Sequence, residues 1–140
     1  MINIYTDGGA RGNPGPSAIG VYVEDENKKE IISFGKKIGV ATNNVAEYTA
    51  VINAFDYLLE NNELLMKMEI INFFLDSNLV VSQLRGLFKI KNANLRELLF
   101  KIKEKESQIS AKIYYHHIPR EQNKKADKLV NLALDNKLSG

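Results

Sequence analysis

Four acidic residues occupy positions where an ordinary surface charge is not expected. Asp7 and Asp76 each follow an apolar run of strand length, and Glu47 and Asp127 each lie near the predicted start of a long helix. Like charges about 4 Å apart repel by roughly 4 kcal/mol at an effective dielectric constant of 20. A protein therefore keeps a cluster of carboxylates where cations or protons neutralise it. Two divalent ions held by carboxylates are typical of in-line phosphoryl displacement.

Each of these carboxylates also has a structural interpretation. Asp76 is suited to cap the helix that follows it, and Glu47 is suited to complete a capping box with Asn44 as the cap. Asp127 is suited to the first turn of a helix, where the macrodipole favours a negative charge. These alternatives stay open for each residue alone, but the four together favour a common site.

The first acidic residue stands before an unusual segment. Residues 2–6 are mostly β-branched or aromatic, which predicts a short strand that ends at Asp7. The next nine residues include four glycines and two prolines. Such a composition is typical of a loop that needs positive φ angles and close backbone approach. A carboxylate beside such a loop suits metal and phosphate chemistry.

The elements that position these residues can be predicted from apolar periodicity. The pattern predicts strands at residues 2–6, 18–24, 31–40, 70–75 and 112–118, and helices from about 42 to 61, 77 to 86, 95 to 102 and 123 to 138. This order indicates an antiparallel meander followed by right-handed parallel crossovers. We therefore expect an α/β fold, a five-stranded mixed sheet flanked by helices, in a single domain of residues 1–140.

The predicted topology brings the acidic residues together. The run at 70–75 is almost continuously apolar, as in a buried central strand. If this strand and the first strand are parallel neighbours, Asp7 and Asp76 emerge at the same edge of the sheet. That edge is where α/β folds usually bind their ligands.

Composition restricts the kind of metal site. The chain has 140 residues, 44% of them apolar, and no cysteine, and its two histidines, His116 and His117, are adjacent. Oxygen ligands, which favour Mg²⁺, Mn²⁺ or Ca²⁺, are therefore expected. No apolar run approaches the roughly 18–20 residues that span a bilayer, and no basic-then-apolar leader opens the chain. We expect a cytoplasmic protein without a membrane partner.

Charge is unevenly distributed along the chain. Residues 1–78 carry 6 Lys or Arg and 11 Asp or Glu, a net charge of −5, and residues 79–140 carry 13 and 6, a net charge of +7. This asymmetry suits a basic surface for phosphates beside an acidic pocket for cations. Ordinary solvated helix faces are the alternative.

Four segments, taken together, resemble the type 1 ribonuclease H family. They are DGGARGNPGPS at 7–17, TNNVAEY at 42–48, DSN at 76–78 and HIPREQNKKAD at 117–127. The resemblance covers essentially the whole chain and implies a ribonuclease H-like fold. It implies that the metal-binding catalytic carboxylates are Asp7, Glu47, Asp76 and Asp127, which hold two Mg²⁺ or Mn²⁺ ions with Asp7 as the bridge. It also implies endonucleolytic hydrolysis of the RNA strand of an RNA–DNA hybrid, leaving 5′-phosphate and 3′-hydroxyl ends.

The resemblance assigns further residues. His117 occupies the position of the family's mobile histidine, and Arg120 is the second candidate for that role near the scissile phosphate. Candidates for contacts with the hybrid are Gly8, Gly9, Asn13, Thr42, Asn43, Asn44, Ser77, Asn78, Lys89 and Lys91.

The chain also departs from the pattern of many bacterial members of this family. They insert a basic protrusion after the second helix, whereas the segment 86–94 is too short for one and leaves Arg85, Lys89, Lys91 and Arg96 as a reduced substitute. We therefore expect weaker, more salt-sensitive binding. The alternatives are a broader nuclease that also cuts double-stranded RNA, or a catalytically idle module that only binds nucleic acid. A monomer is expected.

Overall fold

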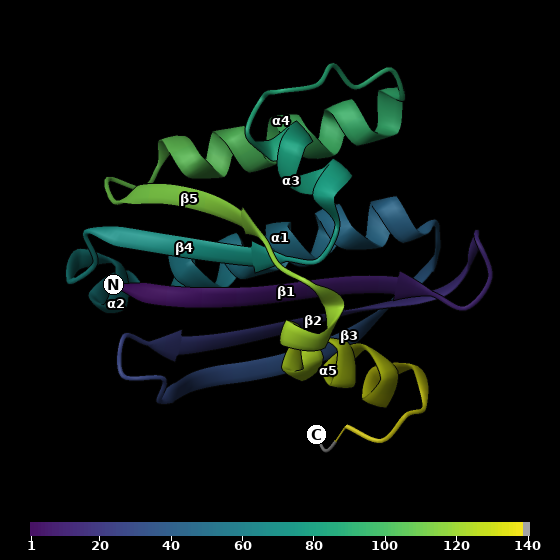
Figure 1. The fold of residues 1–140 in the computed structure, drawn as a ribbon, viewed down its shortest axis with the longest axis horizontal. Coiled ribbons are helices and arrows are strands. Elements are labelled where there is room, and N and C mark those ends of the chain that lie inside the picture. The colour runs from purple at the N-terminus through teal and green to yellow at the C-terminus, as the bar shows by residue number, and fades with distance from the viewer. Residues whose placement is uncertain (139–140) are drawn as a thin grey trace.

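In the computed structural model, which describes residues 1–138, five strands form one mixed sheet (Figure 1). The strand order is β3-β2-β1-β4-β5. The strands are β1 (Ile2–Ala10), β2 (Gly15–Asp25), β3 (Glu30–Ala41), β4 (Ile70–Leu75) and β5 (Lys112–His117). β1, β2 and β3 pair antiparallel, whereas β4 pairs parallel to both β1 and β5. The predicted meander and parallel crossovers are confirmed.

Helices lie on both faces of this sheet. They are α1 (Asn43–Glu60), α2 (Asn62–Met66), α3 (Asn78–Leu84), α4 (Ala93–Ser107) and α5 (Lys124–Leu134), and a 3-10 turn, η1 (Arg120–Gln122), precedes α5. α1 and α4 pack together on one face, and α5 packs on the other, over β1, β2 and β3 (Figure 1). The short helix α2 was not predicted, and α5 ends at Leu134 instead of Leu138. Between residues 1 and 138, none of these helices combines the length and the apolar content that crossing a lipid bilayer requires.

The first strand is longer than predicted. β1 continues beyond Asp7 because Gly8, Gly9 and Ala10 still pair with β2. Its parallel pairing with β4, however, stops at Tyr5 opposite Phe74. The prediction that the strand ends at Asp7 was therefore wrong, because β1 runs to Ala10. Only its parallel pairing with β4 ends before Asp7. Asp7 lies where β1 and β4 separate.

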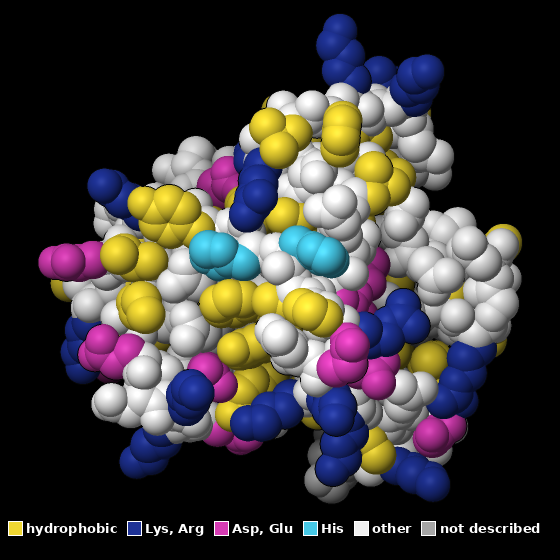
Figure 2. Space-filling model, in the orientation of Figure 1, with side chains coloured by type: hydrophobic (Ala, Val, Ile, Leu, Met, Phe, Trp, Pro, Cys, Tyr) yellow, Lys and Arg dark blue, Asp and Glu magenta, His cyan; other side chains and the backbone are white. Residues whose placement is uncertain are grey.

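The strand β4 is not the buried central strand that its apolar sequence indicates. It lies second from the edge of the sheet, and its burial alternates: Ile71, Phe73 and Leu75 are buried, whereas Asn72 and Phe74 are partly exposed. The reason is that α5 covers β1, β2 and β3 on that face and leaves the same face of β4 and β5 less covered. Figure 2 shows hydrophobic and histidine side chains gathered over this uncovered part of the sheet.

Two helix caps decide between the alternatives for the acidic residues. Thr42 caps α1, since its hydroxyl accepts a hydrogen bond from the Val45 N–H at 3.2 Å. Glu47 is therefore too far along the helix for a capping box, and that alternative was wrong. Ser77 caps α3 in the same way, with the Val80 N–H at 3.3 Å. Neither Glu47 nor Asp76 is used as a cap.

Candidate active site

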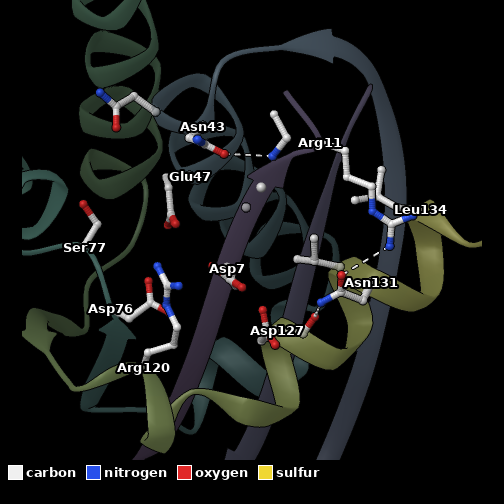
Figure 3. A pocket seen from close by; sticks show the side chains of 15 residues that line it. Asp7, Arg11, Asn43, Glu47, Asp76, Ser77, Arg120, Asp127, Asn131 and Leu134 are labelled. Carbon is white, nitrogen blue, oxygen red and sulfur yellow. Dashed lines mark hydrogen bonds between the residues drawn. The ribbon is translucent and has the colours of Figure 1, made fainter. Parts of the chain in front are cut away.

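The four acidic residues meet where β1 separates from β4. Asp7 comes from β1, Asp76 follows β4, Glu47 comes from α1 behind the sheet, and Asp127 comes from the first turn of α5 in front of it (Figure 3). All four line one open cavity of about 570 Å³. Because the two strands part here, side chains from both faces of the sheet reach a common space. Four residues far apart in sequence thus share one site.

Two glycines allow the helices to approach the sheet closely enough to form this site. A Cβ atom at Gly8 would lie 2.2 Å from the carbonyl carbon and oxygen of Ala46. A Cβ atom at Gly20, which pairs with Asp7, would lie 2.3 Å from the carbonyl oxygen of Ala126. Only residues without a side chain fit at such distances. Gly8 thus permits the position of α1 next to Glu47, and Gly20 permits that of α5 next to Asp127.

Three of the carboxylates are close enough to share one cation. Asp7, Glu47 and Asp76 each offer an oxygen, and these oxygens all lie within 4.8 Å of one another. Asp7 and Glu47 are only 7% exposed, and Oε2 of Glu47 is buried without a hydrogen-bond partner within residues 1–138. A buried carboxylate oxygen without a partner is unfavourable unless a proton or a cation meets it. The cluster therefore fits a hard divalent cation with oxygen ligands.

Burial and the crowding of these carboxyl groups raise the pKa values of two of them, Asp7 and Glu47. Burial is the largest cause that raises the pKa of Asp7 to about 7, and the charges of Asp76 and Asp127 act in the same direction. Burial also raises the pKa of Glu47 well above its ordinary value, with added contributions from Asp7 and Asp76. Without cations, the site therefore retains protons at pH values where exposed carboxyl groups have lost theirs.

Asn123 is a residue of the site that the sequence did not reveal. It is 1% exposed, and its Nδ2 donates to the carbonyl oxygen of Thr6 at 2.9 Å and to Oδ2 of Asp76 at 3.3 Å. It stands at the N-terminal end of α5, but its side chain does not cap that helix. Asn123 thus connects β1, Asp76 and the helix that carries Asp127. An Asn at a helix start ordinarily indicates a cap, and this hid its role.

Two further asparagines fix the loop between β1 and β2 to α1. Oδ1 of Asn43 accepts a hydrogen bond from the Ala10 N–H at 2.9 Å, and Oδ1 of Asn13 accepts one from the Asn43 N–H at 3.0 Å. Since a backbone N–H can only donate, both amide groups must have their oxygen turned to the protein. Each NH₂ group is therefore the end of the side chain that is left to donate to a ligand.

The two candidates for the role near the scissile phosphate lie in different places. Arg120 lines the cavity on the side of Asp76 (Figure 3). His117, the last residue of β5, is exposed and is absent from the cavity lining that the described residues form. The structure thus brings Arg120, and not His117, to the four carboxylates.

Of the remaining predicted residues, some line the cavity and others lie outside its lining. Those that line the cavity are Gly8, Gly9, Asn43, Asn44 and Ser77. Those outside its lining, as far as the described residues go, are Asn13, Thr42, Asn78, Lys89 and Lys91. The cavity is also lined by Ala10, Arg11, Val130, Asn131 and Leu134.

The chain is similar to proteins of known family. Residues 5–133 match the family model described as reverse transcriptase-like. The bifunctional protein Rv2228c of Mycobacterium tuberculosis is 37% identical over 96% of this chain, but the chain spans only 35% of that protein. A ribonuclease H of Clostridium botulinum is 31% identical, and the match covers 96% of this chain and 95% of the relative.

Solved structures are similar over nearly the whole chain. LC11-RNase H1, isolated from compost by a metagenomic approach, has a TM-score of 0.92 and 45% identity, and the match covers 99% of both chains. LC11-RNase H1 in complex with an RNA/DNA hybrid gives the same TM-score with 44% identity, over 99% of this chain and 100% of that one.

Proposed function

The chain belongs to the ribonuclease H family, and we propose that it is an endonuclease that hydrolyses the RNA strand of RNA–DNA hybrids, leaving 5′-phosphate and 3′-hydroxyl ends. The observation that carries the proposal is the convergence of Asp7, Glu47 and Asp76 within 4.8 Å where β1 and β4 separate. The complex of LC11-RNase H1 with an RNA/DNA hybrid supports this choice of substrate. Residues 1–140 would act as one domain and as a monomer, since β1, β4, α1 and α5 of a single chain bring all four carboxylates together.

The carboxylates would hold two Mg²⁺ or Mn²⁺ ions. Asp7, Glu47 and Asp76 supply converging oxygens, and Asp127 faces the cluster from α5 (Figure 3). Asp7, which lies among the other acidic residues, would be the ligand that both ions share. When bound, such ions lower the pKa of a water molecule and neutralise the charge that develops on the phosphate. The contribution of the chain is to hold the acidic groups in place, since β1, α1 and α5 are fixed by close backbone contacts at Gly8 and Gly20.

The asparagines would face the minor groove of the hybrid. A hybrid exposes the 2′-hydroxyls of its RNA strand in a wide, shallow groove. Asn43 lines the cavity, and its amide oxygen is turned to Ala10, so its NH₂ group is free to donate to a sugar or base oxygen. Asn13, which holds Asn43 in place, would donate in the same way at the rim. This arrangement favours RNA because only RNA has a 2′-oxygen in that groove.

Arg120 would stabilise the charge on the scissile phosphate. Its guanidinium is a permanent cation with several donors, and it lines the cavity beside Asp76. His117, on the exposed end of β5, would then contribute less. Arg120→Gln should lower kcat by at least about tenfold, whereas His117→Gln should change it less. The opposite order would assign the role to the histidine.

A direct test compares substrates and metals. Purified protein is incubated with labelled RNA–DNA hybrid, double-stranded RNA and double-stranded DNA, each with Mg²⁺ or Mn²⁺. We expect cleavage of the RNA strand of the hybrid, lost in Asp7→Asn. Absence of hybrid cleavage with either metal, or cleavage unchanged by Asp7→Asn, would refute the proposed function.

A further inference from the structure

Two cationic residues line the cavity, on opposite sides of the carboxylates. Arg120 lies beside Asp76, and Arg11 lies beyond the far end of β1 (Figure 3). Arg11 is four residues beyond Asp7, which corresponds to about 13 Å along an extended chain. Its guanidinium bonds to Asn131 and Asp135 and so lies to one side of the four carboxylates and of the phosphate that their ions would hold (Figure 3). This position suits a neighbouring phosphate of the same strand.

Arg11 is held in the cavity by the last turn of α5 and the residue that follows it. Its Nη1 donates to Oδ1 of Asp135 at 2.6 Å, and its Nη2 donates to Oδ1 of Asn131 at 3.3 Å. The two charged side chains are 49% and 41% exposed, and exposed ion pairs are weak. Asp135 also stands at the C-terminal end of α5, where the helix macrodipole disfavours a negative charge. Helix stability therefore does not explain why residue 135 is acidic. Its ion pair with Arg11, which orients the guanidinium, does explain it.

We propose that Arg11 binds a phosphate of the RNA strand that flanks the scissile one, and that Asp135 holds its guanidinium in place until the strand arrives. This rests on the proposed function. A phosphate presents oxygens to the guanidinium fork as a carboxylate does, and both groups can accept two parallel N–H bonds from it. Asp135 accepts from Nη1 of Arg11 through Oδ1. The strand would then be held on both sides of the carboxylates, by Arg11 on one side and Arg120 on the other.

A structural interpretation of Arg11 makes a different prediction. If Arg11 only connects the loop after β1 to α5, then removing either member of the Arg11–Asp135 pair should weaken hybrid binding equally. If Arg11 binds phosphate, Asp135 competes with the substrate. Neutralising Asp135 then frees the guanidinium and should not weaken binding.

The test measures the affinity for a fluorescently labelled hybrid by anisotropy, as a function of salt concentration. All proteins carry Asp7→Asn so that cleavage does not interfere. Arg11→Gln should weaken binding by about 5- to 10-fold and reduce the slope of log affinity against log salt by about one. Asp135→Asn should leave the affinity unchanged or raise it about two- to threefold, and the double variant should match Arg11→Gln. Lys36→Gln, which removes an exposed cation of β3 outside this cavity, is the matched control and should change the affinity by less than about twofold.

The position of the contact can be determined with hybrids in which one RNA phosphate at a time is replaced by a neutral methylphosphonate. When the methylphosphonate replaces the flanking phosphate that Arg11 binds, the hybrid should already bind more weakly, and Arg11→Gln should cause no further loss of affinity. The inference is overturned if Asp135→Asn weakens binding as much as Arg11→Gln, if Arg11→Gln behaves like Lys36→Gln, or if no such position exists. Cleavage by the protein with Asp7 intact is measured separately, so failure of the proposed function is recognised independently.

Discussion

Two positions of β1, Ile4 and Asp7, are both buried but differ in chemistry. Ile4 is fully buried beside Phe73 in an apolar core, whereas Asp7 is 7% exposed and lies among the carboxylates of Glu47 and Asp76. Burying an aliphatic side chain such as Ile4 stabilises the fold by about 1.5–3 kcal/mol. Burying several carboxylates destabilises it unless cations or protons are present. Over one strand, the fold thus changes from residues that stabilise it to residues retained for their chemistry.

The largest effect is expected from filling the space at Gly8. Gly8→Ala places a Cβ atom 2.2 Å from the backbone of Ala46, so α1 must move away from β1. We expect a loss of about 3 kcal/mol or more in the free energy of unfolding, measured by urea denaturation, together with loss of hybrid cleavage.

Gly9→Ala is the matched control on the same strand. A Cβ atom there would meet the Val130 side chain at 3.6 Å, an ordinary contact. Its cost should stay below about 1 kcal/mol. Equal losses for Gly8→Ala and Gly9→Ala would contradict the claim that close approach of α1 forms the site.

The next effect concerns pH in the absence of metal. A carboxyl group whose pKa is raised on folding stabilises the protein fully below its unfolded pKa of about 4, and this contribution is lost as the pH rises through its folded pKa. For Asp7 the folded pKa is about 7. In EDTA, the wild type should therefore lose a few kcal/mol relative to Asp7→Asn between pH 4 and pH 8.

Thermal unfolding of the wild type and Asp7→Asn across this pH range checks the sign of this pH dependence of stability. A difference between the two proteins that stays constant with pH would show that Asp7 is not crowded by its neighbours.

A smaller effect is expected from Asn123. Asn123→Ala removes the hydrogen bonds to Thr6 and Asp76, which should lower the free energy of unfolding by about 1–3 kcal/mol and raise the Mn²⁺ concentration needed for half-maximal activity. The matched control is Asn61→Ala, which removes an exposed amide bonded to the Tyr57 carbonyl oxygen. If both variants require the same Mn²⁺ concentration as the wild type, Asn123 has no role in positioning Asp76.

The part of the structure that could be predicted follows from local patterns. Strand runs, their order and the acidic residues beside them are enough to place Asp7 and Asp76 at one edge of a mixed sheet. The continuation of β1 past Asp7 was missed because Gly8 and Gly9 suggest a loop, whereas Gly8 is needed for the approach of α1.

Other features depend on contacts that no local pattern contains. Arg11 is held by Asn131 and Asp135, which lie at least 120 residues away. Asn123 stands at a helix start, but its amide bonds to β1 and to Asp76 instead. Such pairings are determined by how the helices pack on the sheet, and sequence periodicity shows which face packs but not which side chains meet.

The most direct test of the central claim is the thermal unfolding of the wild type and Asp7→Asn at neutral pH, with and without Mn²⁺. If the buried cluster is retained for cations, Asp7→Asn should be as stable as the wild type or more stable without metal. Mn²⁺ should then raise the melting temperature of the wild type by about 5 °C or more and that of the variant by much less. A variant that is clearly less stable than the wild type without metal, with an equal Mn²⁺ shift in both proteins, would instead make Asp7 a structural residue and contradict the account.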